Sequence, residues 1–240
     1  MVSTPLDPQL IRKGGERRLY TGAALLALLI VFAGFARTYY LKGAYGTPDL
    51  SVLVHMHGFV MTAWVTLFLV QVRLVATGRT DLHRRLGVIG AALAILLVIV
   101  GMITAITAAR NGVTPGPPPL VFLAIPIGDM AVFTILITAA ILYRRRADFH
   151  KRLMLLATLS ILTAAIARIP VDVLHSGGLP AFFGTTDLVI LACIAFDTVK
   201  NRRLHPAFAA GLVLVIASQA ARFLIAGTPQ WQRFAGWLVG

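Results

Sequence analysis

The sequence predicts an all-α, polytopic membrane protein with seven transmembrane helices. Of its 240 residues, 58% are hydrophobic and only 13% are charged, and the mean hydropathy is +0.83. The apolar residues form runs of about 20, the length that a helix needs to cross a ~30 Å hydrocarbon core. Because an open β-sheet cannot satisfy its backbone hydrogen bonds in lipid, helices are the structure that fits these runs.

Seven segments are expected to span the membrane, and together they form one domain over residues 1–240. In chain order they are 19–38, 52–74, 86–109, 120–143, 153–170, 184–199 and 206–226. The sixth is short, and residues 179–183 can extend it. The loop RNGVTPGPPPL before the fourth is rich in proline and glycine and is expected to be non-helical. After the seventh, Trp231, Phe234 and Trp237 have a spacing that suits the outer membrane interface.

Basic residues predict the orientation of the chain. The net charge of +13 would indicate nucleic acid as a partner in a soluble protein, but here the charges alternate between loops. Sixteen of the 22 basic residues lie before the first span or in every second loop: Arg12, Lys13, Arg17, Arg18, Arg73, Arg79, Arg84, Arg85, Arg144, Arg145, Arg146, Lys151, Arg152, Lys200, Arg202 and Arg203. By the positive-inside rule, we expect a cytoplasmic N-terminus and an external C-terminus, in a bacterial inner membrane, with lipid and not nucleic acid as the surroundings.

Three histidines occur in similar sequence blocks. The blocks RTDLHRRLGVIGAAL, RADFHKRLMLLATLS and RRLHPAFAAGLVLVI place His83, His150 and His205 at the predicted cytoplasmic starts of spans three, five and seven. On a helix, His83 shares one face with Gly87 and Gly90. Because glycine has no side chain, this face leaves room for a partner helix or a flat cofactor. The usual role of a histidine beside arginines at a helix end is contact with lipid headgroups or loops, and this alternative stays open.

Polar residues inside the outer halves of the spans form a second candidate site. A charge within the bilayer is expensive unless it is paired or hydrated. The residues are His57, Asp129, Arg168, Asp187, Gln219 and Arg222. One interpretation is a single cavity, with Asp129 and Arg168 as candidate catalytic residues and His57 as a candidate metal ligand. The alternative is a structural network in which Asp129 pairs with Arg168 or Arg222. His55 points to another side of the helix from His57, so the two cannot hold one metal.

The sequence resembles two known families. His57 and then Gln71 on span two, LHRRLG at span three and HKRLMLLATLSILTAAIARI at span five resemble the uncharacterised bacterial membrane family called domain of unknown function 2306. The resemblance covers roughly residues 52 to 170 and implies a fold and topology, not an activity. A looser similarity is to ascorbate-dependent transmembrane b-type cytochromes, whose histidines clamp haem between neighbouring helices. That similarity implies His83 and His150 as axial ligands of haem b.

Three classes of function are compatible with these patterns. The first is a b-type haem protein that exchanges electrons with quinone or a membrane redox partner, with Arg84, Arg85 and Arg152 near the haem propionates. The second is an intramembrane enzyme with zinc or iron in the outer-half cavity. The third is a transporter, sensor or assembly factor without a cofactor. A retinal protein is excluded because no lysine lies inside a span, and the single cysteine, Cys193, excludes an internal disulfide and a cysteine metal cluster.

Overall fold

The structure is a computed structural model that describes residues 8–114 and 116–240, and these residues form helices and short loops without a β-strand. The helices are α1 Pro8–Phe35, η1 Ala36–Tyr40, η2 Lys42–Tyr45, α2 Val52–Ala76, α3 Thr80–Arg110, α4 Pro119–Phe122, α5 Ala124–Leu142, α6 Ala147–Ser160, α7 Thr163–Ile166, α8 Asp172–Ser176, α9 Gly178–Asn201, α10 Pro206–Ile225 and α11 Pro229–Val239. Within these ranges, seven segments are long and apolar enough to cross a membrane. The all-α, multi-pass fold class is therefore confirmed.

Several helices begin at residues whose side chains cap them. The hydroxyl of Ser51 accepts a hydrogen bond from the Val54 amide at the start of α2, and Thr228 does the same for α11. His205 caps α10 through its Nδ1 atom, which accepts from the Ala207 amide. Each cap satisfies one of the amide groups that a helix start leaves without a partner.

Three of the differences between the predicted and the observed helix boundaries are informative. The third span begins at Thr80, six residues early, because the basic block before its apolar run is itself helical. The predicted non-helical loop ends sooner than expected, since Pro119 starts α4, where a proline needs no amide partner. The fifth span is not one helix: it is interrupted between Ser160 and Thr163 and so consists of α6 and the single turn α7.

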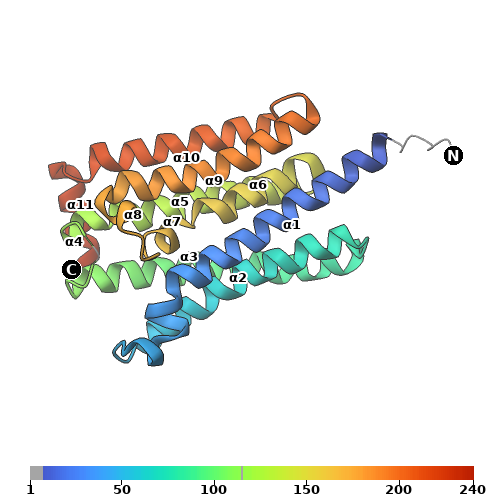
Figure 1. Ribbon diagram of the computed structural model, residues 1–240. Coiled ribbons are helices and arrows are strands. Elements are labelled where there is room, and N and C mark those ends of the chain that lie inside the picture. Colours follow the sequence, from blue (N-terminus) through green and yellow to red (C-terminus); the bar gives the residue numbers. More distant parts are fainter. Residues whose placement is uncertain (1–7, 115) are drawn as a thin grey trace.

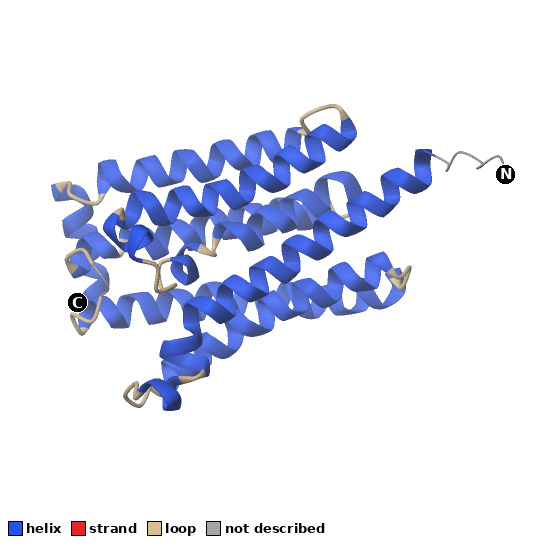
Figure 2. Cartoon of the chain, viewed as in Figure 1, coloured by secondary structure: helices blue, strands red, loops and turns tan. Residues whose placement is uncertain are grey.

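The spans run alternately up and down, so that alternate connections meet at the same end (Figure 1). We call the basic end the one formed by the α2–α3, α5–α6 and α9–α10 connections; short loops join the helices there (Figure 2). The chain finishes at the opposite end with α11, whose Trp231 Nε1 donates to the Leu120 carbonyl.

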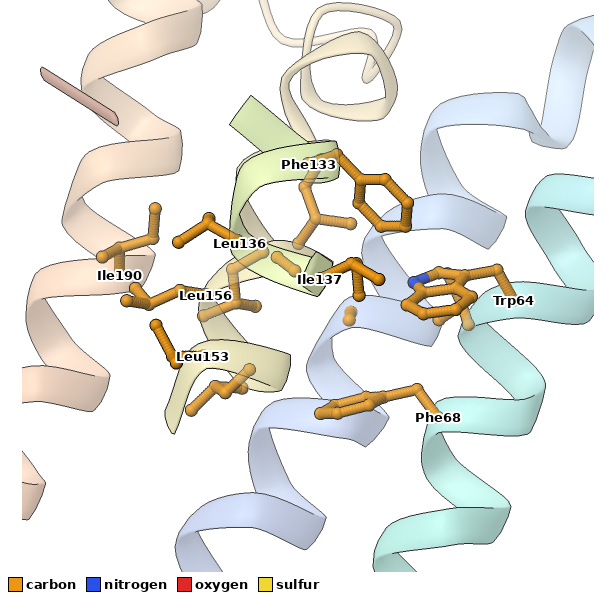
Figure 3. Close-up of a cluster of buried hydrophobic side chains, with 14 of the residues drawn as sticks. Trp64, Phe68, Phe133, Leu136, Ile137, Leu153, Leu156 and Ile190 are labelled. Atoms are coloured by element: carbon orange, nitrogen blue, oxygen red, sulfur yellow. The ribbon is translucent and has the colours of Figure 1, made fainter. Parts of the chain in front are cut away.

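The fifth span lies at the centre of the bundle. In its most apolar stretch of 18 residues, 67% of the residues are buried inside the protein, against 22–44% in the corresponding stretches of the other spans. Leu153 and Leu156 of α6 pack with Leu136 and Ile137 of α5, and Phe133 meets Trp64 of α2 edge to face (Figure 3). Helix α1 crosses the bundle between α2 on one side and α6, α7 and α9 on the other. This core fixes the relative positions of the two sites described next.

Candidate functional site

His83 and His150 lie together at the basic end. Each is in the first turns of its helix, α3 and α6, and each follows a short connection from the preceding span. Their ring centroids are 6.3 Å apart and their planes are inclined by 73°. Two residues far apart in the sequence therefore present a pair of imidazoles to one another, in the place where the sequence predicted that two helix starts would meet.

Hydrogen bonds determine which nitrogen of each ring carries the proton. The Nδ1 atom of His150 is 2.8 Å from the Ala140 carbonyl oxygen, which can only accept, so Nδ1 is the donor. The Nδ1 atom of His83 is 2.8 Å from Gln71 Oε1, while Gln71 Nε2 donates to the His83 carbonyl and thereby orients the amide. In the neutral rings both Nε2 atoms then keep a lone pair, which is the arrangement of metal-binding histidines.

The glycine face of α3 admits a partner helix, which is one of the two occupants expected for it. A side-chain carbon placed on Gly90 would come 3.5 Å from Leu67, and one placed on Gly87 would come 3.9 Å from Gln71 Nε2. The glycines therefore admit the neighbouring helix α2. Arg152 was misplaced near the propionates, because it is 3% exposed and bound to Asp197 on α9, whereas Arg84 and Arg85 are exposed.

The candidate residues of the opposite half gather mainly around α10. Arg222 Nη1 donates to Asp129 Oδ1 of α5 at 2.6 Å, and Arg222 Nη2 donates to Ser218. One turn away, Gln219 Nε2 donates to Asp187 Oδ1 of α9 at 2.9 Å. The predicted buried partner for Asp129 is thus present and is Arg222. A carboxylate and a guanidinium that neutralise one another satisfy the requirement for charges inside a bilayer.

His57 and Arg168 stay outside this hydrogen-bonded set. Arg168 donates to the Ala164 carbonyl and lies over the ring of Phe35, at the surface of the bundle. His57 is within electrostatic range of Arg168, and its buried Nδ1 atom has no hydrogen-bond partner in the described part of the chain. The six polar residues therefore do not form one hydrogen-bonded site: four of them are joined through α10, and His57 and Arg168 are not.

The outer-half metal hypothesis finds no ligand cluster. Among residues 8–114 and 116–240, no three His, Cys, Asp or Glu side chains lie together in a way that could hold a metal ion. Asp129 is taken by Arg222, and His175 bonds the Ala167 carbonyl through Nε2. The two-histidine arrangement at the basic end is a different kind of site, since haem iron needs only axial ligands from the protein.

A cluster that the sequence did not predict occupies the basic end between α1, α6, α9 and α10. Arg152 makes a two-pronged ion pair with Asp197, at 2.8 and 3.0 Å, and both residues are buried. Beside it is a cavity of about 480 Å³ lined by Glu16, Asp148, Lys151, Arg152, Asn201, Arg203 and His205. The sequence had suggested Arg152 only as an orientation signal and as a partner of the haem propionates. The presence of Asp197 inside an apolar span was the clue to its partner.

Comparisons with family models, curated proteins and solved structures give no match for this chain. The resemblances described above accordingly stay expectations, and any function must be argued from the geometry of the residues themselves.

Proposed function

We propose that this protein is an integral membrane redox protein in which His83 and His150 are the axial ligands of a b-type haem. The observation that carries the proposal is the paired imidazoles whose Nδ1 atoms both face carbonyl oxygens. Such a bond fixes the ring, keeps the lone pair on Nε2 and raises its basicity toward a metal. A histidine that merely touches headgroups needs no such partner.

The separation of the rings supports the same proposal. The ring centroids are 6.3 Å apart, so the two imidazoles are close enough that they could hold one bound group together. Arg84 and Arg85 are exposed beside His83 and are suited to hold carboxylates of the cofactor at the membrane surface. When bound, the haem would supply one-electron chemistry.

In this proposal the residues around the pair have separate tasks. His83 and His150 hold the iron, while Gln71 and the Ala140 carbonyl orient the two rings. The electron partner is a quinone or another membrane redox protein. The basic end faces the cytoplasm of a bacterial inner membrane, as supported by the concentration of basic residues there. Reporter fusions after Gly46, Pro117 and Gly178 then give an external signal, and a cytoplasmic signal at two of them contradicts this orientation.

The spectrum of the purified protein tests the proposal. Wild type from cells supplied with haem is expected to show a low-spin b-type reduced-minus-oxidised spectrum, and His83→Ala and His150→Ala are each expected to lose it. His55→Ala is the matched control, because His55 is exposed on α2 and remote from the pair in the sequence. A colourless wild type, or a spectrum unchanged in both ligand variants, rejects the proposal.

A transporter without a cofactor is the second candidate. The observation that favours it is that α10 carries Gln219 and Arg222, which bind carboxylates from two different helices inside the membrane-spanning region. Intramembrane charges of this kind commonly mark ion or substrate pathways. The test is solute uptake into proteoliposomes that contain the purified protein. Uptake that is lost on substitution of Arg222, by protein that shows no haem spectrum, distinguishes this candidate from the first.

A further inference from the structure

We propose that the cavity at the basic end binds the phosphate group of an organic phosphate, and that Arg203 and Lys151 are its main ligands. The cavity is separate from the histidine pair and does not depend on the redox proposal. Its volume of about 480 Å³ is within the usual range of small-molecule pockets and is too large for an inorganic ion alone. Its walls are formed by three helices, α1, α6 and α9, and by the α9–α10 connection, which carries Arg203 and His205.

The carboxylates of this region already have partners. Lys151 Nζ binds Glu16 Oε2 at 2.8 Å, and His205 Nε2 binds Asp148 Oδ2 at 3.2 Å. Behind the wall, both oxygens of Asp197 accept from Arg152. Glu16 and Asp197 thus have cationic partners within the protein, whereas Asp148 receives only a hydrogen bond from His205.

The unused hydrogen-bonding capacity of the cavity consists mostly of donors. Arg203 is exposed, lines the cavity and forms no hydrogen bond or ion pair with the described part of the chain, so its guanidinium donors are available to a ligand. The ammonium group of Lys151 has three N–H donors, and one hydrogen bond to another side chain is present. Planar guanidinium and ammonium groups together match the oxygens of a phosphate.

Tyr20 supports the view that this region is built for polar contacts. Its hydroxyl is buried and has no hydrogen-bond partner among the described residues, although its ring lies 5.7 Å from Lys151 Nζ. A buried hydroxyl without a partner is unfavourable by about 1–3 kcal/mol. Tyr20 is not among the residues that line the cavity, so its hydroxyl marks a polar environment beside Lys151 and not a contact to the ligand.

The phosphate could come from a soluble metabolite or from a lipid headgroup, because the cavity lies where the helices leave the apolar part of the chain. Binding is measured on the whole protein by thermal shift and by calorimetry with glycerol 3-phosphate, with sodium chloride at equal ionic strength as the reference. A second measurement compares nanodiscs of phosphatidylglycerol with nanodiscs of phosphatidylcholine. Saturable binding of glycerol 3-phosphate identifies a soluble ligand, and stabilisation by phosphatidylglycerol alone identifies the headgroup.

Three variants test the assignment with opposite signs. Arg203→Gln is expected to weaken binding of the active probe about tenfold, the effect of one lost charge-assisted hydrogen bond. Glu16→Gln is expected to strengthen it, because Lys151 is released. Arg145→Gln is the control, since Arg145 is an exposed arginine at the same end and does not line the cavity. The proposal is overturned if neither probe binds, or if Arg145→Gln weakens binding as much as Arg203→Gln.

Discussion

Arg152 and Asp197 form a two-pronged ion pair between α6 and α9, in which both carboxylate oxygens accept from the same guanidinium. The remaining side of that guanidinium donates to the Asp148 carbonyl. Few side chains other than arginine can make these contacts at once. The pair therefore joins the central helix to α9 at the level of the basic end, and it forms one wall of the cavity there.

Replacing Arg152 by lysine is expected to destabilise the protein although the charge is kept. An ammonium group cannot reproduce the planar fork, so at least one oxygen of Asp197 is left buried without its donor. Loss of one such bond is expected to lower the free energy of unfolding by about 1–3 kcal/mol, as measured by thermal unfolding in detergent micelles. Arg85→Lys serves as the control because Arg85 is exposed on α3. Equal stability of Arg152→Lys and wild type would show that the fork is not needed.

Removing one member of the Asp129–Arg222 pair is expected to be more damaging than removing both. Each single substitution, Asp129→Leu or Arg222→Met, leaves an uncompensated charge inside the bundle, which is unfavourable by about 3–5 kcal/mol. The double variant leaves none, so its loss should be well below the sum of the two single losses. A double-mutant cycle by chemical unfolding measures this coupling. Additive losses would mean that the two groups do not interact.

Gly128 is expected to be required for the same ion pair. A side-chain carbon at this position would collide with the Nε atom of Arg222 and with the neighbouring Cζ at 2.8 Å. Gly128→Ala should therefore displace Arg222 from Asp129 and lower the unfolding temperature. Gly22→Ala is the matched control, because Gly22 lies within α1 and nothing is within 4 Å of the added carbon. That control should be neutral or stabilising by up to about 1 kcal/mol.

Gln71 is expected to act as a positioning residue if the histidine pair holds haem. Gln71→Leu removes the acceptor at His83 Nδ1, and loss of such a partner typically weakens metal binding 10–100-fold. Gln71→Glu keeps an acceptor, so it should retain the cofactor, and its more basic partner should lower the midpoint potential. Haem titration and redox titration measure the two effects. Identical affinities for the three proteins would contradict this role.

Acid is expected to destabilise the protein through His205. Burial lowers the pKa of His205, and the hydrogen bond to Asp148 offsets only part of that effect. The unfolded chain therefore binds a proton more readily than the folded protein as the pH falls below about 6.5, so stability decreases from there downward. Protonation also removes the acceptor that caps α10. His205→Asn keeps a capping oxygen but does not titrate, so its unfolding temperature should depend less on pH between 8 and 5 than that of wild type.

The sequence predicted the elements of this fold better than their contacts. Apolar runs separate the spans so clearly that all seven could be located, and the shared end of α3 and α6 placed His83 near His150. Pattern alone could not choose between Arg168 and Arg222 as the partner of Asp129, because that choice depends on which faces of α5, α7 and α10 meet. The interruption after Ser160 also had no proline or glycine to announce it.

That interruption divides the most buried span into the 14-residue helix α6 and the single turn α7. A continuous helix transmits an axial push or twist from one membrane surface to the other, since every turn is hydrogen-bonded to the next. Here the regular α-helical bonds give way beyond Ser160 to a tighter turn, in which the Leu162 amide donates to the Leu159 carbonyl, and Thr163 is hydrogen-bonded to Thr186 of α9. A displacement at the basic end that turns α6 can thus leave α7 in place. Continuous helices such as α10, which packs against both α5 and α6 and is unbroken from Pro206 to Ile225, offer a more direct mechanical connection between the two faces.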